Sequence, residues 1–276
     1  MTERKTIEVP AGELSYIDRG HGRPVVFVHG NPSSAEEFVP VMAMLGDGVR
    51  CVAPDHVGFG RSSKPPDWDY LPTSHAANLA LLLDPLDLHD ATVVVGDWGG
   101  PIGLSWVLNH PERVGRVVIT NTWLWPVDRS LYYQAFSKLM GGPLGRWATR
   151  NHNAFARLVV RQAWGRATPL TPELHASFTS VHAEPDERNG MWVFPREITG
   201  SSAWLAGLWE RRSVLHDIDM HIVWGLRDIA FRADVLDRWT TEFPEAAVDR
   251  LADVGHFPAL EATDHVVEAI RRQRPS

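Results

Sequence analysis

The stretch that most constrains the fold of this chain is residues 92–104, TVVVGDWGGPIGL. Its β-branched run, Val93 to Val95, is typical of a strand buried on both faces. Asp97 follows almost at once, and the residues from Gly99 to Pro101 open an apolar segment typical of a helix with proline in its first turn. The stretch therefore predicts a strand that turns sharply into a helix, with an acidic residue at the corner.

A strand-to-helix corner that carries a reactive side chain is a nucleophile elbow. A serine there needs a base to become a nucleophile, whereas an aspartate, with a pKa of roughly 3.9, is already an anion at neutral pH. The dipole of the following helix favours that negative charge. Asp97 can therefore displace a leaving group from carbon and form an ester. Because aspartate is also a common helix N-cap, the elbow alone leaves a purely structural role open.

Strands and helices alternate along the chain on both sides of this elbow. Besides the elbow strand, strands are predicted at residues 5–9, 13–18, 24–29, 50–54, 114–121, 221–224 and 247–251. Helices are predicted from Ser33 or Ser34 to about Leu45, at 72–88 with Pro85 ending or kinking the helix, at 99–109, at 233–242 and after Pro258. This alternation predicts βαβ units and a mostly parallel sheet with right-handed connections.

Residues 122–217 have a different sequence pattern, because they lack strand signals and predict several short helices. Seven of the twelve tryptophans lie in this segment, and we expect most of them to pack between it and the sheet: Trp123, Trp125, Trp147, Trp164, Trp192, Trp204 and Trp209. We therefore predict a helical cap domain at 122–217, inserted into a core domain formed by residues 1–121 and 218–276.

Charge and cysteine content narrow the classes of function. The 276 residues carry a net charge of −7, spread along the chain, which argues against a nucleic-acid partner. Cys51 is the single cysteine, so no disulfide can form within the chain and a reducing compartment is expected. The first residues lack an apolar signal core, and no apolar run approaches the ~18 residues that span a bilayer. We expect a soluble cytoplasmic protein with no membrane partner, and we leave homo-oligomers open.

Catalytic side chains in open parallel sheets lie at the carboxyl ends of strands. Those ends carry His29 and Asn31, Asp97 and Trp98, Asp228, and His256. The order of nucleophile, acid and histidine is that of α/β-hydrolases, which predicts Asp228 and His256 as acid and base. Each could instead be an ordinary loop residue. The strand at 114–121 ends in Asn121 and Thr122, and no carboxylate there competes with Asp228. Structural roles are expected for His29, Asp55 and His56.

Taken together, these motifs resemble those of haloalkane dehalogenases of the α/β-hydrolase superfamily, over nearly the whole chain. The resemblance is carried by His29-Gly30-Asn31-Pro32, Gly58-Phe59-Gly60-Arg61-Ser62, Asp97-Trp98-Gly99-Gly100, Val193-Phe194-Pro195-Arg196-Glu197-Ile198, Asp228 and Gly255-His256-Phe257. It implies an α/β-hydrolase fold, with a mostly parallel eight-stranded sheet flanked by helices and an inserted helical cap. The acid after the later strand, with Asn31 as a halide ligand, is similar to one recognised subfamily. Gly96 and Val95 depart from the pattern of many relatives.

The resemblance also implies roles for the site residues, and the same roles are required by the chemistry of displacing a halide from carbon. Asp97 attacks the halogen-bearing carbon, and the side chains of Asn31 and Trp98 bind the departing halide as hydrogen-bond donors. His256, oriented by Asp228, activates the water that hydrolyses the ester. The backbone N–H groups of Asn31 and Trp98 form the oxyanion hole. Further pocket walls are expected at Pro195 and Phe257. No metal or organic cofactor is required, and the expected partners are a small neutral haloalkane and the halide product.

Other functions of this fold make different demands on the residues. An epoxide hydrolase would use the same Asp97, Asp228 and His256, but it needs an acid donor for the epoxide oxygen, commonly a pair of cap tyrosines. Tyr132 and Tyr133 are adjacent, and neighbours on a helix diverge by ~100°, so they do not easily converge on one oxygen. A carboxylated substrate would require an arginine near the elbow to bind its carboxylate, and residues 98–105 contain none. A ligand-binding protein without activity needs none of the reactive groups, and a serine esterase needs a serine at the elbow.

Overall fold

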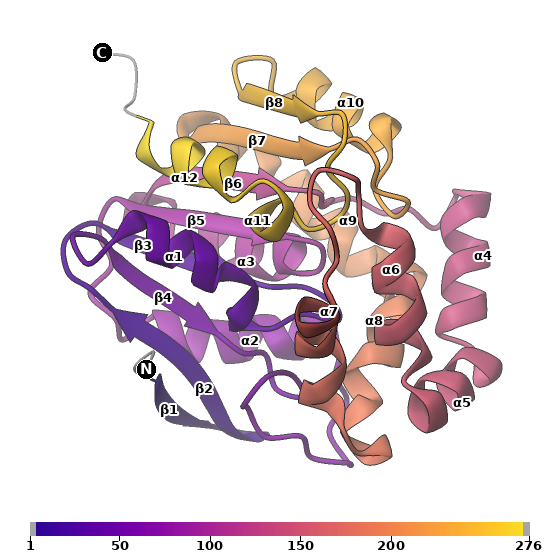
Figure 1. Ribbon diagram of the computed structural model, residues 1–276. Coiled ribbons are helices and arrows are strands. Elements are labelled where there is room, and N and C mark those ends of the chain that lie inside the picture. Colours follow the sequence, from indigo (N-terminus) through magenta and orange to yellow (C-terminus); the bar gives the residue numbers. More distant parts are fainter. Residues whose placement is uncertain (1–3, 273–276) are drawn as a thin grey trace.

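The computed structural model describes residues 4–272, and these form one eight-stranded sheet with helices on both faces (Figure 1). The strands are β1 (Arg4–Val9), β2 (Gly12–Arg19), β3 (Pro24–Val28), β4 (Arg50–Pro54), β5 (Ala91–Gly96), β6 (Val114–Thr120), β7 (Asp219–Gly225) and β8 (Ala247–Leu251). Their order across the sheet is β1-β2-β4-β3-β5-β6-β7-β8. β2 runs antiparallel to both of its neighbours, and all other adjacent pairs are parallel. The predicted mostly parallel sheet is confirmed.

The sheet is buried on both faces, as the β-branched runs predict. Val93 and Val95 pack into the apolar layer on one face, and Val94 packs into the layer on the other. The first layer is covered by α2 (Pro72–Leu83), α3 (Gly99–Asn109) and α10 (Ala233–Glu242), and the second by α1 (Val39–Leu45), α11 (Pro258–Glu261) and α12 (Thr263–Arg271). Alternate side chains of one strand thus anchor two helical layers.

Most helix boundaries lie where proline and capping residues predict them, but two predicted helices are each divided into two pieces. α2 ends at Leu83, before Pro85, as predicted. The segment expected as one helix up to Leu45 is instead a 3-10 turn, η1 (Ala35–Phe38), followed by α1; the side chain of Ser34 caps the turn. The last helix is likewise two pieces, because the backbone at Ala262 is not helical (φ −147°) and separates α11 from α12.

The residues between β6 and β7 contain helices and turns and no strand. The helices are α4 (Leu131–Met140), α5 (Pro143–His152), α6 (Val160–Ala163), α7 (Pro172–Thr179), α8 (Asn189–Gly200) and α9 (Ser202–Glu210). Figure 1 shows α4 to α8 beyond the edge of the sheet toward which the parallel strands point. Trp123 and Trp125 are buried, in agreement with a packing role, but Trp147 is 56% exposed, so that expectation is wrong for this residue.

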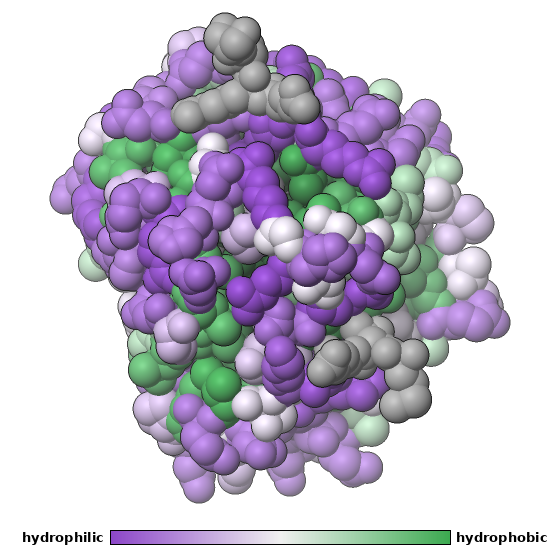
Figure 2. All heavy atoms as spheres, turned by 90° about the vertical axis from the view of Figure 1, so that its left-hand side faces the viewer, coloured by the Kyte–Doolittle hydropathy of each residue, from purple (hydrophilic) through white to green (hydrophobic). Residues whose placement is uncertain are grey.

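The side of the sheet farthest from α4–α8 is largely hydrophilic, with small separate apolar areas (Figure 2). Among residues 4–272, no helix combines the length and the apolar character that crossing a membrane requires.

Candidate active site

The sharp turn after β5 presents Asp97 at the carboxyl edge of the sheet. Asp97 adopts φ 47°, in the left-handed region that a non-glycine residue rarely occupies. The turn needs close backbone approach, because a Cβ at Gly99 would overlap the carbonyl oxygen of Val28. Val95, the departure noted in the motif, fits because Gly103 faces it: a Cβ there would lie 2.7 Å from Val95 Cγ1. The elbow therefore has the geometry that its sequence predicts.

The carboxylate of Asp97 is held by backbone donors. The N–H of Asn31 donates to Asp97 Oδ1 at 2.6 Å, and the N–H of Trp98 also donates to this carboxylate. Burial raises the pKa of Asp97, while the charge of His256 and the two N–H groups act to lower it. The two donors expected to form an oxyanion hole therefore lie against one oxygen-bearing group, and Asp97 Oδ2 lies 3.6 Å from His256 Nε2.

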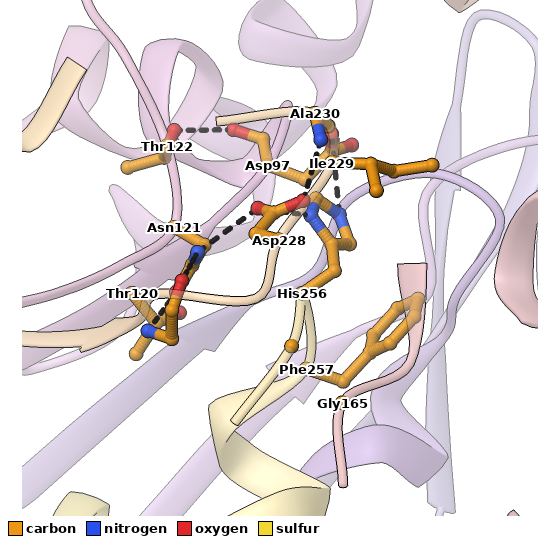
Figure 3. Close-up of polar contacts among 12 residues, drawn as sticks. Asp97, Thr120, Asn121, Thr122, Gly165, Asp228, Ile229, Ala230, His256 and Phe257 are labelled. Atoms are coloured by element: carbon orange, nitrogen blue, oxygen red, sulfur yellow. Dashed lines mark hydrogen bonds and ion pairs between the residues drawn. The ribbon is translucent and has the colours of Figure 1, made fainter. Parts of the chain in front are cut away.

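His256 bridges the two carboxylates. Its Nδ1 lies 2.8 Å from Asp228 Oδ2, and both side chains are buried (Figure 3). Burial by itself would lower the pKa of His256, but the charge of Asp228, its hydrogen bond and the charge of Asp97 outweigh burial and raise this pKa to about 9. The structure thus brings together Asp97, His256 and Asp228, which are far apart in the sequence.

Asn121, at the end of β6, contacts the site although the sequence did not predict a role for it, because an amide is not a candidate acid. Its Nδ2 donates to Asp228 Oδ2 at 2.9 Å (Figure 3). Its Oδ1 accepts from Gly225 N at 2.8 Å. Its backbone carbonyl accepts from Asp97 N at 3.0 Å. Asp228 Oδ1 in turn accepts from Ala230 N at 2.7 Å. Asn121 therefore connects the turn at Asp97 with the carboxylate of Asp228. The signal for it in the sequence was its position at the end of a predicted strand.

Glu261, at the end of α11, also went unnoticed and anchors the histidine loop. Its carboxylate accepts hydrogen bonds from the backbone N–H groups of Gly165, Gly255 and Phe257, at 2.7, 3.0 and 3.2 Å. Burial raises the pKa of Glu261, and these donors counteract the rise. This one buried side chain joins both neighbours of His256 to the segment between β6 and β7.

A cavity of about 240 Å³ opens between the sheet edge and the helices after β6. Asn31, Asp97, Trp98 and His256 line its polar end. Most of its remaining lining is apolar, with Phe136, Phe155, Val160, Ile198, Ile229 and Phe231 among the side chains. Pro195 and Phe257, the two expected pocket walls, also line it. An uncharged organic molecule can therefore reach the Asp97 carboxylate in surroundings of low polarity.

Two residues whose side chains carry N–H groups, Asn31 and Trp98, line this cavity beside Asp97. Trp98 is stacked on Phe194, with ring centroids 5.3 Å apart, and lines the cavity beside Asp97. The Asn31 amide donates to the carbonyl of Met191 at 3.3 Å, which leaves its second hydrogen available. That carbonyl is free because Pro195, four residues later in α8, has no N–H to offer it. The proline thereby orients the Asn31 amide.

Other residues singled out in the sequence lie at the base of these loops. His29 Nε2 accepts from His56 N at 2.9 Å. The Asp55 carboxylate is buried and accepts from Ala35 N and Arg61 N at 2.8 and 2.9 Å. Gly96 is required by packing, since a Cβ there would lie 2.6 Å from Thr120 Oγ1.

Within the described part of the chain, no group of three or more His, Cys, Asp and Glu side chains is arranged to hold a metal ion.

Comparison of the sequence with known proteins shows which family it resembles. Residues 23–263 match the family described as alpha/beta hydrolase fold. Haloalkane dehalogenase 2 of Mycobacterium tuberculosis is 31% identical over 270 residues, which cover 97% of this chain and 93% of that protein. A cis-3-alkyl-4-alkyloxetan-2-one decarboxylase of Xanthomonas campestris pv. campestris is 32% identical, over 97% of this chain and 94% of that protein.

Two solved structures share the fold. The haloalkane dehalogenase DatA from Agrobacterium tumefaciens superposes with a TM-score of 0.82 at 24% identity, over 96% of this chain and 94% of that one. A mutant of DBJA superposes with a TM-score of 0.85 at 22% identity, over 97% and 96% of the two chains. With an α/β-hydrolase sheet, an acidic elbow and near full-length relatives of this kind, the chain belongs to the α/β-hydrolase fold family, in the branch that includes the haloalkane dehalogenases.

Proposed function

We propose that this protein hydrolyses neutral haloalkanes to a primary alcohol, a halide ion and a proton, through an ester on Asp97. One observation carries the proposal. The Asp97 carboxylate, the Asn31 amide and the Trp98 indole line the same apolar cavity, with His256 beside them. An anionic nucleophile next to two neutral N–H donors suits a reaction in which a carbon–halogen bond breaks and an anion leaves.

In the first step, an oxygen of Asp97 attacks the halogen-bearing carbon, and the electron pair of the carbon–halogen bond departs with the halide. Because Oδ1 accepts the N–H of Asn31, Oδ2 is the attacking oxygen. The halide needs no proton, only donors in a site from which water is excluded. Asn31 Nδ2–H and Trp98 Nε1–H supply them, and neither side chain carries a negative charge.

In the second step, water hydrolyses the ester. His256 Nε2 takes a proton as the water oxygen bonds to Cγ of Asp97, and the negative oxygen is held by the N–H groups of Asn31 and Trp98. The bond between Cγ and the alkoxy oxygen then breaks, His256 gives its proton to the departing alcohol, and the Asp97 carboxyl that remains loses a proton to solvent. Asp228 keeps the ring oriented and stabilises its cationic form.

The two steps are linked through the charge on Asp97. In the free enzyme this charge helps to raise the pKa of His256 to about 9. An ester on Asp97 carries no charge, so its formation removes that contribution and lowers the pKa of the imidazole. Alkylation thus prepares the base that the next step requires.

We further propose that residues 122–217 act as the cap domain that shapes the substrate cavity, on a core formed by residues 1–121 and 218–276. The support is that α4, α6 and α8 supply much of the apolar lining. We also infer a cytoplasmic location, since Cys51, the one cysteine, is a buried free thiol that suits a reducing compartment.

Epoxide hydrolysis is disfavoured by the cap tyrosines. The hydroxyl of Tyr133 donates to the carbonyl of Ala230 at 2.9 Å, and that of Tyr132 donates to the carbonyl of Ile229. Each hydroxyl hydrogen is therefore committed to the backbone, and an epoxide oxygen would have to compete for it.

A second candidate is decarboxylation of a cis-3-alkyl-4-alkyloxetan-2-one, which the 32% identity to an enzyme of that name favours. Such a substrate is also uncharged and apolar, and it would fit the same cavity. Its products would be an alkene and carbon dioxide, with no halide.

The test is incubation of the protein with 1-bromo- and 1-iodoalkanes, a terminal epoxide and a cis-dialkyl oxetan-2-one. Halide and primary alcohol in equal amounts from the haloalkanes, with little diol or alkene from the others, support dehalogenation. Diol formation, or alkene formation without halide release, would replace the proposal with the corresponding alternative.

A further inference from the structure

A second, much smaller cavity lies against the same carboxylate. Its volume is about 10 Å³, which is about the least that one water molecule requires. Asp97 and His256 line both cavities, whereas Ser33, Glu37 and Thr120 line only the small one. A molecule in the small cavity therefore touches both the nucleophile and the base without entering the space available to a haloalkane.

Glu37 is the ionisable group in this lining to which the two-step mechanism gives no task. It lies in η1, which is anchored by the buried Ala35 and Phe38 and held by a hydrogen bond from Glu37 N to Ser34 O of 3.0 Å. Its carboxyl interacts electrostatically with both His256 and Asp97. The turn thus places an acidic side chain in the lining of the cavity that Asp97 and His256 also line.

The surroundings of Glu37 suit contact with water rather than a permanent ion pair. Burial raises the pKa of Glu37 to about 7, with Asp97 adding to the rise, while the Ser33 hydroxyl and His256 oppose it. Thr120 Oγ1 is already committed to the carbonyl of Val95 at 3.0 Å. Glu37, His256 and Asp97 are the ionisable side chains of this lining that can bind a water in the cavity.

The neighbouring acid, Glu36, is placed quite differently. It is exposed and pairs with Arg4 at 2.7 Å, away from the cavity lining. Two adjacent glutamates of the same turn therefore have opposite surroundings, which makes Glu36 a matched control for Glu37.

We propose that Glu37 is a positioning residue for the hydrolytic water, and that it acts in the second step of the reaction and not in the first. The Glu37 carboxyl accepts one hydrogen of a water in the small cavity, and His256 Nε2 accepts the other. A lone pair of the water oxygen is then directed at Cγ of Asp97, where the new C–O bond forms. The inference rests on the proposed function, because it concerns hydrolysis of the Asp97 ester.

The experiment separates the two steps with rapid-quench kinetics on the full chain and a 1-bromoalkane, following bromide and the mass of the enzyme. For Glu37→Leu we expect bromide release in the first turnover at a rate within about two-fold of wild type. Hydrolysis of the ester should slow by about a hundred-fold, the order of loss that misplacement of a reacting group produces. The variant should therefore give a burst of bromide and accumulate enzyme whose mass is increased by the alkyl group.

Two further variants identify the cause. Glu37→Gln keeps an acceptor oxygen and should recover most of the hydrolysis rate, whereas Glu36→Leu should match wild type in both steps. If Glu37→Leu does not fold, Glu37→Ala is measured in its place with the same expectation.

The outcomes distinguish this inference from the function on which it rests. Wild-type rates in both steps for the apolar variants, or equal slowing of both steps, would overturn the role of Glu37 and leave dehalogenation standing. A wild-type protein that releases no halide from any haloalkane overturns the proposed function, and the role of Glu37 in ester hydrolysis falls with it.

Discussion

The two cavities that meet at Asp97 differ in almost every respect. The larger, of about 240 Å³, is lined mainly by apolar side chains, many of them from the helices between β6 and β7. The smaller, of about 10 Å³, is lined mostly by residues of the sheet-edge loops and contains the additional acid Glu37. The carboxylate and His256 belong to both. In the proposed reaction, Asp97 would meet the apolar substrate in the larger cavity and the hydrolytic water in the smaller one.

The most damaging change to this arrangement is Asp97→Ala, since it removes the group that both cavities share. We expect halide release from a 1-bromoalkane to fall by more than about 10⁴-fold, a loss comparable to that of a nucleophile in other hydrolytic triads. Bromide assay and a thermal melt check this. Substantial halide release by a well-folded Asp97→Ala variant contradicts the mechanism.

His256→Phe should separate the cavities functionally. Alkylation of Asp97 needs no base, so the first turnover should proceed, whereas hydrolysis should slow by about 10²- to 10⁴-fold. Mass spectrometry of the enzyme after mixing with a 1-iodoalkane should detect a stable alkyl adduct on the peptide that contains Asp97. A variant that never forms the adduct would mean that His256 also serves the first step.

Trp98→Phe tests the large cavity alone. It keeps an aromatic ring against Phe194 but removes the indole N–H, so the departing halide loses a donor. We expect the alkylation rate to fall by about a hundred-fold, with the ester hydrolysed at the wild-type rate. Single-turnover measurements of each step check this, and slowing confined to hydrolysis is the contrary result.

A smaller effect is expected from Pro195→Ala. The new N–H at position 195 can bond the carbonyl of Met191, which now accepts from the Asn31 amide at 3.3 Å. Loss of one neutral hydrogen bond of about 1 kcal/mol corresponds to roughly five-fold slower alkylation. The matched change Pro143→Ala, in the first turn of α5, leaves Asn31 untouched and should have no such effect.

The contrast between polar and apolar surroundings extends to the histidines and predicts how stability depends on pH. Burial lowers the pKa of His29 and His182 to about 3, and of His75 well below its usual value, whereas carboxylates raise that of His256 to about 9. The first three are protonated in the unfolded chain below pH ~6.5 but remain neutral in the fold. Each therefore costs up to about 1.4 kcal/mol of stability per pH unit as the pH falls below ~6.5.

His75→Phe isolates one of these contributions. Both ring nitrogens of His75 lack a hydrogen-bond partner in the described part of the chain, and the ring packs against Trp68 at 4.7 Å and Phe194 at 4.9 Å. We expect the variant to be about as stable as wild type at pH 7.5 and about 1–2 kcal/mol more stable at pH 5. Urea unfolding at both pH values measures this. An equal effect at the two values would mean that His75 does not titrate on unfolding.

Much of the fold was predictable because local signals and tertiary packing agree. The runs around Val93 and Val118 are β-branched and bounded by polar residues or turns, so their strands were located to within a residue or two. Pro85 ends α2 for a reason that is local to the chain. Where contacts with distant residues decide, the predictions fail: α1 is preceded by a separate 3-10 turn, and Trp147 is exposed although it was expected to pack.

The site shows the same division. Asp97, Asp228 and His256 were predicted as site residues because acidic and imidazole side chains at strand ends are recognisable in a sequence, and the structure places them in contact. Asn121 and Glu261 were missed, since an amide or a carboxylate that serves other groups has no signature of its own. Asn121 bonds to Asp228, 107 residues away in the sequence, and Glu261 bonds to Gly165, 96 residues away.

By itself, the sequence determined the alternation of strands and helices, the acidic elbow and the order of the reactive residues. All of these depend on neighbouring residues and on the periodicity of apolar side chains. Only the tertiary structure decided that Asp97 separates an apolar cavity from a polar one, that Pro195 frees a carbonyl for Asn31, and that Glu37 rather than Glu36 lies beside His256. The physical reason is that cavities, desolvation and orientation of donors arise from groups distant in the chain, whose distances no local pattern encodes.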